Sequence, residues 1–166
     1  VHSMGASGDF AELDRKAATI FAAQAHALDH VIYLGGLLPQ GANVSAHLYS
    51  RAEVGEILRG YCKVTEFRAG PVIGSGSASF EMVRYLTERL PIMVAPRWIL
   101  NEVQPVAIRD VLSYLIAALE RGPLGIIDIG GARLTFRQMM QEYAAVRGLH
   151  RIIIPVPVPA PLSLIG

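Results

Sequence analysis

His47 and Arg51 are the residues whose types and spacing best suit chemistry. They lie four positions apart in a segment expected to be helical, so both side chains share one face. An imidazole can donate or accept a proton near neutral pH, and a guanidinium can bind hydroxyl groups or a phosphate. The same face continues with Val54 and Leu58, where an unpaired guanidinium would be costly to bury. Two interpretations follow: Arg51 emerges at the helix edge to meet Glu66 or solvent, or His47 and Arg51 border a ligand site.

Two other histidines, His26 and His30, have the spacing at which imidazoles on one helix can bind a metal ion. His30 falls where this helix is expected to give way to a strand. No further histidine or cysteine cluster completes a ligand set, so we predict no metal site.

The Gly74-Ser75-Gly76-Ser77 loop precedes a predicted helix, so its N–H groups and hydroxyls could face a phosphate. No lysine follows in the P-loop position, and the alternative is an ordinary loop with a helix cap at Ser77 or Ser79. Arg97 and Trp98 are either a stacking wall for a substrate or part of the packing. No Ser/His/Asp or Cys/His nucleophile arrangement can be assembled from the sequence.

The composition excludes several classes of protein. Fifteen lysines and arginines against fourteen aspartates and glutamates leave a charge of +1, so nucleic acid is not an expected partner. Every long uncharged stretch is broken by Gly, Pro, Asn or His, so no membrane span is predicted. The single cysteine, Cys62, allows no internal disulfide, which suits a cytoplasmic location. At 52% hydrophobic residues, the 166-residue chain can bury the core of one domain.

Segments typical of strands and helices alternate along the chain with short glycine-rich connections. This order predicts an α/β fold with a mostly parallel sheet and helices on both faces. Ligands of such sheets bind at the carboxyl ends of the strands. The expected strands or extended segments are residues 1–4, 31–34, 64–68, 92–94, 103–108, 126–129 and 153–159. The expected helices are residues 10–28, 45–59, 77–90, 110–120 and 135–147.

Apolar periodicity assigns a core-facing stripe to four of the five expected helices. Gly55, inside the second helix, costs about 1 kcal/mol relative to alanine and therefore predicts close packing against a neighbouring element. The expected stripes are Leu13, Ala17, Ile20, Phe21 and Ala25 in the first helix, Phe80, Val83, Leu86 and Leu90 in the third, and Phe136, Met139, Met140, Tyr143 and Val146 in the last.

Several motifs in this order resemble a known family. The chain contains Val31-Ile32-Tyr33-Leu34-Gly35-Gly36, then His47-Leu48-Tyr49-Ser50-Arg51, then Phe67-Arg68-Ala69-Gly70. Residues 105–111 and Ile129-Gly130-Gly131 extend the likeness over nearly the whole chain. The combination resembles the later part of an atypical extended short-chain dehydrogenase/reductase, similar to NmrA-like and nucleoside-diphosphate-sugar-epimerase-like NAD(P)-binding proteins.

The resemblance implies a Rossmann-type fold with NAD or NADP across the strand ends and the nicotinamide near the second helix. Enzymes of the family use Tyr-x-x-x-Lys, and the matching positions here are His47 and Arg51, the expected catalytic pair. Arg51 is also expected to contact the cofactor, whereas Tyr49 lies on a different helical face. The other expected cofactor-binding residues are His2, Ser3, Met4, Gly5, Leu34, Gly35, Gly36, Pro71, Val72 and Ile73. The expected substrate-binding residues are Ser75, Ser77, Ser79, Arg97 and Trp98.

The resemblance also implies that the chain is one part of the family's protein. Residues 1–90 would be the C-terminal half of the NAD(P)-binding domain, and residues 91–166 a mixed region with a small substrate-side subdomain. The family's glycine-rich pyrophosphate turn, and the residue that selects NAD or NADP, would precede Val1. We therefore expect an exposed apolar edge or patch, covered by a second copy or a complementing chain.

Three functions remain open at this point. The first is an oxidoreductase or epimerase acting on a small-molecule substrate. The second is a non-catalytic NAD(P)-binding sensor or scaffold subunit, because the Tyr-x-x-x-Lys pair is missing. The third is a chain that binds no dinucleotide by itself, because it lacks the phosphate-binding turn.

Overall fold

The computed structural model describes residues 10–39 and 44–157, which form two compact units. Among the described residues, the first unit holds residues 10–39, 44–69 and 111–129, and the second holds 70–110 and 130–157. Over the described residues, the chain therefore crosses between the units three times. The boundary expected after residue 90 lies inside the second unit, and the strand expected at residues 1–4 lies outside the described residues.

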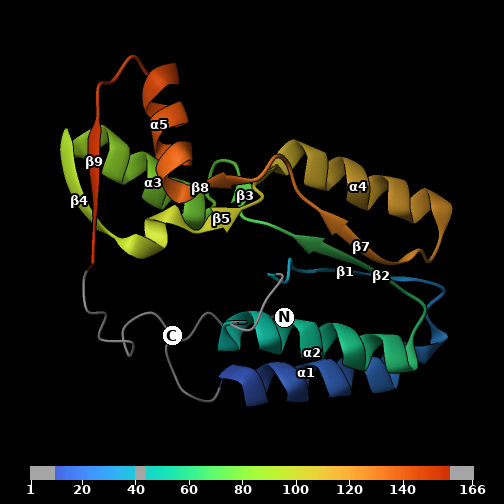
Figure 1. The fold of residues 1–166 in the computed structure, drawn as a ribbon. Coiled ribbons are helices and arrows are strands. Elements are labelled where there is room, and N and C mark those ends of the chain that lie inside the picture. The colour runs from blue at the N-terminus through green and yellow to red at the C-terminus, as the bar shows by residue number, and fades with distance from the viewer. Residues whose placement is uncertain (1–9, 40–43, 158–166) are drawn as a thin grey trace. The chain divides into compact units, whose positions relative to one another are not determined.

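A three-stranded parallel sheet forms the centre of the first unit (Figure 1). Its order is β1, β2, β7, and the register places Tyr33 beside Glu66 and Glu66 beside Ile126. The strands are β1 (Val31–Gly36), β2 (Val64–Ala69) and β7 (Gly125–Ile129). The helices are α1 (Phe10–Gln24), the 3-10 turn η1 (Ala25–Ala27), α2 (Ala46–Tyr61) and α4 (Ile108–Arg121). The first turn of α4 belongs to the second unit.

Helices cover both faces of this sheet, as the sequence predicts. Successive residues of a strand point to opposite faces. In β2, Glu66 contacts α2 through Arg59, whereas the next residue, Phe67, lies 6.0 Å from the ring of Tyr114 in α4. The α/β class and the parallel sheet with helices on both faces are therefore confirmed for this unit.

The periodicity assigned the wrong face of α1 to the core. The buried residues of α1 are Asp14, Ala18 and Ala22, whereas Ile20 and Phe21 are exposed. Small side chains let α1 pack closely on α2, and this outweighs the burial of larger residues on the other flank. Leu13, in the predicted stripe, is also exposed, whereas Ala25 of η1 is buried as expected.

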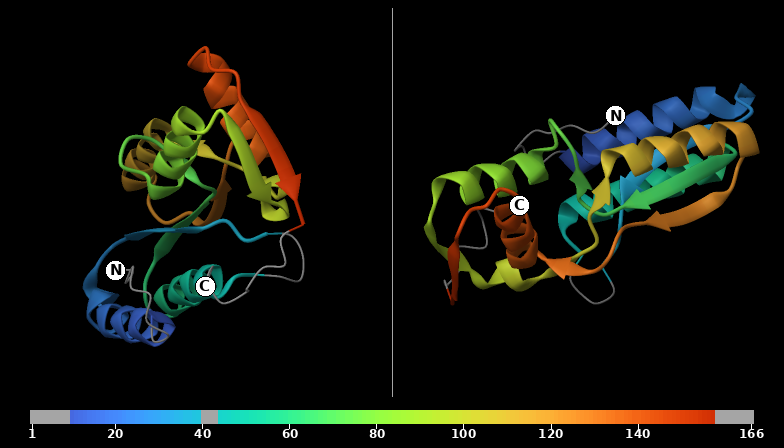
Figure 2. Two further views of the ribbon diagram at one scale, coloured as in Figure 1. Left: turned by 90° about the vertical axis from the view of Figure 1, so that its left-hand side faces the viewer. Right: turned by 90° about the horizontal axis from the view of Figure 1, so that it is seen from above.

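Three short two-stranded ladders and two helices build the second unit. The strands of the β4 and β9 ladder are parallel and lie side by side (Figures 1 and 2). The elements are β3 (Val72–Ile73) with β6 (Val106–Ala107), β4 (Ile92–Pro96) with β9 (Ile152–Val156), β5 (Glu102–Val103) antiparallel to β8 (Leu134–Thr135), α3 (Ala78–Arg89), the 3-10 turn η2 (Arg97–Leu100) and α5 (Phe136–Val146).

The core of the second unit lies between its ladders and α3 and α5. The predicted core residues Val83, Met139 and Met140 are buried in it, together with Met93, Ala95, Ile99 and Ile153. Leu90 and Val146 are corrections, because both are exposed; Leu90 follows the last residue of α3, and Val146 ends α5. The expected extended run 103–108 is two short strands, and Ile108 begins α4.

The predicted helix caps are confirmed. Ser45 caps α2 by accepting from the Leu48 N–H, and Ser77 caps α3 by accepting from the Phe80 N–H. Thr135 caps α5 in a reciprocal capping box with Gln138. These side chains satisfy backbone donors that have no partner inside their own helix.

Large apolar side chains are exposed on the first unit. On α4 they follow the spacing of one helix face, at Leu112, Ile116 and Leu119, of which Leu119 is 71% exposed. No helix among the described residues is long and apolar enough to cross a membrane.

Candidate functional site

The carboxyl end of β1 and the first turns of α2 lie against each other. A β-carbon added to Gly36 would lie 2.5 Å from Cδ2 of Leu48 and 3.7 Å from Cδ of Arg51. A side chain at residue 36 would therefore require the Leu48 side chain to move. Gly36, the last residue of β1, therefore lies beside the Arg51 side chain.

The guanidinium of Arg51 combines burial with an unused hydrogen-bond donor. Its Nε atom is buried and has no hydrogen-bond partner among the described residues, while the residue as a whole is half-buried. A buried donor left without a partner costs about 1–3 kcal/mol. Within the described residues, this donor therefore remains unsatisfied.

His47 occupies the helix turn before Arg51 and is exposed. Its ring lies edge-on to Phe10 of α1, with the ring centroids 5.2 Å apart. The contact joins the first residue of α1 to the first turn of α2 and leaves the imidazole open to solvent. An exposed imidazole can exchange protons with a bound molecule or with water.

A buried polar cluster lies behind Arg51. Tyr33 of β1 donates from its hydroxyl to the backbone carbonyl oxygen of Arg51 at 2.9 Å. Ser50, the preceding residue of α2, donates from its hydroxyl to Oδ2 of Asp14 in α1 at 3.1 Å. Asp14 and Ser50 are almost completely buried. Burial raises the pKa of Tyr33 to about 12, opposed by the positive charge of Arg51 and assisted by the carboxylate of Asp14.

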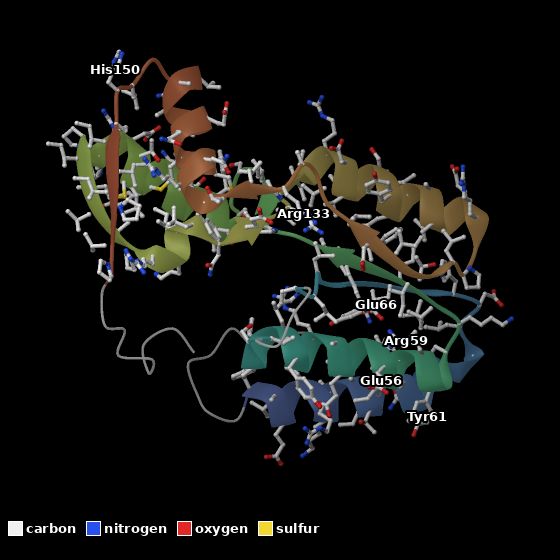
Figure 3. All side chains as sticks on the ribbon, in the orientation of Figure 1. Glu56, Arg59, Tyr61, Glu66, Arg133 and His150 are labelled. Atoms are coloured by element: carbon white, nitrogen blue, oxygen red, sulfur yellow. The ribbon has the colours of Figure 1, made fainter. Side chains whose placement is uncertain are left out.

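Glu66 forms a second buried cluster, between α2 and the sheet (Figure 3). Its carboxylate is paired with Arg59 of α2 and, at 2.8 Å, with Nε of Arg68 in β2. Burial and the nearby Arg68 lower the pKa of Arg59. Glu66 also explains Gly55, because a β-carbon there would lie 2.5 Å from Oε2. The predicted close packing of Gly55 is confirmed, and Glu66 is paired with these two arginines in the structure.

The predicted cofactor residues after β2 belong to the second unit. Val72 and Ile73 form β3, which pairs with β6, and Pro71 accepts a hydrogen bond from the Val106 N–H at 3.0 Å. The carbonyl of Val72 also accepts from the hydroxyl of Ser77. The Ser77 hydroxyl thus donates one hydrogen bond and accepts another inside the protein, which supports the interpretation of this residue as an ordinary loop residue and helix cap.

The other predicted substrate residues are accessible. Ser75 lies in the exposed turn before α3, and Ser79 is exposed in its first turn. Arg97 and Trp98 are both in η2 and exposed, and the Trp98 ring lies edge-on to Phe136, 5.7 Å away. Trp98 therefore packs against α5 while 38% of it stays exposed.

Some predicted residues cannot be placed, and one has another role. The predicted cofactor residues His2, Ser3, Met4 and Gly5 lie outside the described residues. His30 lies 2.8 Å from Oγ1 of Thr65, which also accepts from the Leu124 N–H, so it links the start of β1 to β2. Within the described part of the chain, no group of His, Cys, Asp and Glu could hold a metal ion.

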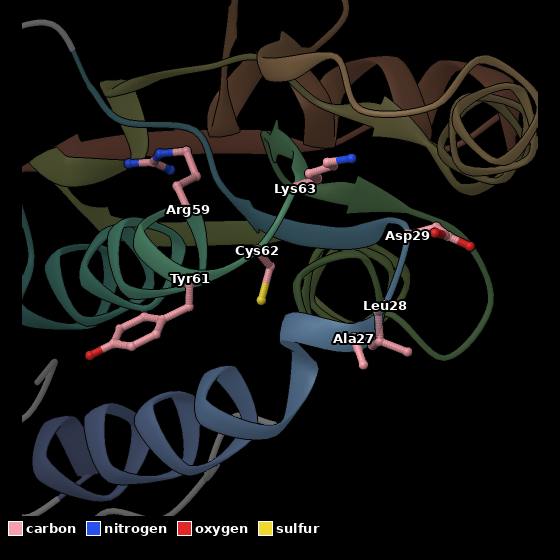
Figure 4. A pocket seen from close by; sticks show the side chains of 7 residues that line it. All are labelled: Ala27, Leu28, Asp29, Arg59, Tyr61, Cys62 and Lys63. Atoms are coloured by element: carbon pink, nitrogen blue, oxygen red, sulfur yellow. The ribbon is translucent and has the colours of Figure 1, made fainter.

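A pocket of about 340 Å³ opens at the other end of the sheet, beside the amino ends of β1 and β2 (Figure 4). The side chains of Asp29, Tyr61 and Cys62 point in different directions, so they do not converge on one ligand atom. Ligands of open parallel sheets bind at the carboxyl ends, so this pocket is a poorer candidate than the Arg51 region. Its lining residues are Ala27, Leu28, Asp29, Arg59, Tyr61, Cys62 and Lys63.

Sequence reasoning missed the polar cluster of Asp14, Tyr33 and Ser50. Tyr33 lies in an apolar strand and resembles a core aromatic. Asp14 is flanked by charged residues in the sequence, which is typical of a solvated face. The available signal was its spacing, because Asp14, Ala18 and Ala22 recur at four-residue intervals with only small apolar companions.

Comparisons with known proteins bear on the fold. No protein-family model matches the chain, and no curated protein matches it. One similar solved structure is UDP-glucose 4-epimerase from Thermus thermophilus in complex with NAD, with 18% identity and a TM-score of 0.68 over 89% of this chain and 58% of that one. A second is UDP-glucose 4-epimerase from Thermotoga maritima with UDP-glucose, with 17% identity and a TM-score of 0.70 over 92% of this chain and 59% of that one. A third is a dTDP-4-dehydrorhamnose reductase from Clostridium acetobutylicum, with 11% identity and a TM-score of 0.74 over 95% of this chain and 64% of that one.

The likeness establishes the class of fold. The chain has the partial Rossmann-like α/β fold found in these sugar-nucleotide epimerases and reductases, and it spans about three fifths of the length of their chains. At such low identity the likeness extends to the fold alone. Activity, cofactor and substrate are therefore matters for proposal.

Proposed function

We propose that this chain is part of an NAD(P)-binding oxidoreductase or nucleotide-sugar-epimerase-like protein of the extended short-chain dehydrogenase/reductase type. The observation that carries the proposal is the position of Arg51 beside Gly36 at the carboxyl end of β1. Similar solved structures contain NAD or UDP-glucose, which agrees with the cofactor and substrate class proposed here.

The residues at the strand end fit a dinucleotide. Gly35 and Gly36 bear no side chains, so a ligand can approach the backbone there. The buried Nε of Arg51 has no hydrogen-bond partner in the described part of the chain, and a ribose hydroxyl or a phosphate oxygen would supply one. The bound nicotinamide would supply the hydride chemistry. His47 would hold or release the proton at its imidazole.

The second unit is proposed to bind the substrate. Pro71, Val72 and Ile73 remain proposed cofactor-binding residues, and Ser75, Ser79, Arg97 and Trp98 remain proposed substrate-binding residues. Ser77 contributes by holding the first turn of α3 rather than through its hydroxyl, which is already bonded at both functions. This assignment agrees with the small-molecule nucleotide sugar in a similar solved structure.

The experiment replaces His47 with alanine. If His47 is the proton donor, His47→Ala abolishes substrate turnover and leaves the affinity for NADH or NADPH within about twofold, because the imidazole is not the residue that holds the cofactor. Unchanged turnover would contradict the role of His47. Turnover is followed by nicotinamide absorbance over a panel of carbonyl compounds and sugar nucleotides.

A non-catalytic sensor or scaffold subunit is the second candidate. It is favoured by the exposed imidazole in place of the family's tyrosine. A protein of this kind binds the dinucleotide but changes no nicotinamide absorbance with any member of the same panel. We also propose a cytoplasmic location. The exposed apolar residues of α4 would meet a second copy or a complementing chain, and sedimentation velocity would detect the complex.

A further inference from the structure

The first turns of α2 are held by two polar contacts from different elements. Tyr33 of β1 reaches the carbonyl oxygen of Arg51 at 2.9 Å, and Asp14 of α1 receives the hydroxyl of Ser50 at 3.1 Å. The two contacted residues are adjacent in the sequence, so the contacts fix the helix from two directions. Both act on the turn that carries Arg51.

The contacts between α1, α2 and β1 carry a desolvation cost, because they bury polar groups. Asp14 is 2% exposed and Ser50 is 1% exposed, so both lost their hydration on folding. Replacing a buried polar set with apolar residues of similar size is often neutral or stabilising. Elsewhere α1 contacts α2 through small apolar residues such as Ala18 and Ala22, and through the exposed ion pair of Arg15 with Glu53.

Polar contacts differ from apolar ones in their directional requirement. A rotation of α2 by one residue, about 100°, would break both hydrogen bonds and carry Arg51 away from Gly36. Apolar packing alone tolerates such shifts more readily, since it is not directional. The buried cluster therefore favours the helix orientation in which the Arg51 side chain lies beside Gly36.

We propose that Tyr33 and Asp14 are positioning residues that hold Arg51 at the carboxyl end of β1. For cofactor binding the inference rests on the proposed function, but the placement of Arg51 can be measured without any cofactor. Neither residue needs to touch the ligand. Tyr33 acts through the backbone of Arg51, and Asp14 acts through Ser50.

The first test uses Tyr33→Phe, which removes one hydroxyl and keeps the ring. NMR of the Arg51 side-chain Nε–H and hydrogen exchange of the amides of residues 49–51 report the placement directly. We expect a shifted Nε–H signal and about fivefold faster exchange of these amides, the change that corresponds to one net hydrogen bond. Tyr61→Phe is the matched control, because Tyr61 is exposed at the end of the same helix. An unchanged Nε–H signal and unchanged exchange would overturn the proposal.

The second test is a double-mutant cycle read by titration with NADH and NADPH. Tyr33→Phe should weaken binding about fivefold in the wild-type background and have no effect in the Arg51→Ala background, because its action passes through Arg51. A general loss of stability would lower affinity equally in both backgrounds, and that result would contradict positioning. If the wild-type protein binds neither dinucleotide, the proposed function fails, whereas the NMR test still decides the positioning role.

The contribution of the Ser50–Asp14 hydrogen bond can be tested separately from that of the Tyr33–Arg51 hydrogen bond. Ser50→Ala removes the donor to Asp14 and should reproduce the Nε–H shift of Tyr33→Phe. The single substitution Asp14→Asn keeps a side-chain oxygen that can accept from Ser50, so the Arg51 Nε–H signal of this variant should equal that of the wild type. If Ser50→Ala leaves the Arg51 signal unchanged, Asp14 is not a positioning residue.

Discussion

Gly55 of α2 faces the buried carboxylate of Glu66 so closely that a β-carbon at residue 55 would lie 2.5 Å from Oε2. The carboxylate occupies the space that the missing side chain leaves. It is then within reach of Arg59, one helical turn further along α2, and of Arg68 on its own strand. The absence of a side chain at Gly55 therefore makes room for the Glu66 carboxylate and for its ion pairs.

Gly55→Ala is expected to destabilise the protein by about 1–3 kcal/mol, because an added methyl group must displace Glu66 from its partners. Gly60→Ala is the matched control on the same helix. A β-carbon there meets nothing within 4 Å, so this variant should be neutral or gain up to about 1 kcal/mol in helix propensity. Urea unfolding measures both. Equal effects of the two substitutions would show that Glu66 does not occupy the space beside Gly55.

Glu66→Ala removes the shared partner of two arginines. We expect a loss of roughly 2–4 kcal/mol, since Arg59 and Arg68 would keep partly buried, uncompensated charges. Adding Gly55→Ala to this variant should cost little more, because the carboxylate that obstructs the methyl group is gone. Full additivity of the two losses in urea unfolding would contradict the coupling.

Tyr33 should influence stability at alkaline pH. Its pKa of about 12 in the folded protein lies above the ordinary value of 10.0, chiefly because burial disfavours the phenolate. A pKa raised on folding contributes stability that is complete below the unfolded pKa and is lost as pH rises through the folded pKa. The stability difference between wild type and Tyr33→Phe should therefore change between pH 10 and 12, measured by urea unfolding at each pH. A difference that is constant over this window would contradict the raised pKa.

Glu88 in the second unit should give stability the opposite pH dependence, because its pKa is lowered rather than raised. The hydrogen bond from Tyr143 at 2.6 Å lowers the pKa of Glu88, assisted by Arg84 and Arg147. A lowered pKa contributes stability that is present above the unfolded pKa and lost as pH falls through the folded value. Tyr143→Phe should therefore reduce the melting temperature at neutral pH and by less in acid, well below the ordinary pKa of 4.5. Tyr85→Phe, an exposed tyrosine on α3, is the control, and an equal reduction at both pH values would exclude this role for Glu88.

Most of the fold could be predicted from the sequence, because local signals are strong. The caps at Ser45, Ser77 and Thr135 fix where three helices begin, and the run Val31–Gly36 has the composition of a buried parallel strand. The buried face of α1 could not be predicted, because packing against α2 decides it. A scale of hydrophobicity favours Ile20 and Phe21 over the small residues that form the contact.

The candidate site could be predicted only in part. The conflict between Arg51 and its apolar face drew attention to the helix turn whose side chains lie beside Gly36, where Cδ of Arg51 would be 3.7 Å from an added β-carbon. Its supporting residues Tyr33 and Asp14 come from two other elements, and only the three-dimensional structure brings them together. The partner of Glu66 could not be assigned either, because Arg51 and Arg59 lie on neighbouring parts of one helix.

The most direct test of the proposed function is a fluorescence titration of the wild-type protein and of Arg51→Ala with NADH and NADPH. We predict saturable micromolar binding of one of the two by the wild type and at least tenfold weaker binding by Arg51→Ala, because the guanidinium loses its contact with the dinucleotide. Arg121→Ala, at the end of α4, should bind like the wild type. Absence of binding by the wild type, or equal affinities of wild type and Arg51→Ala, would contradict the role of Arg51 in holding NAD(P).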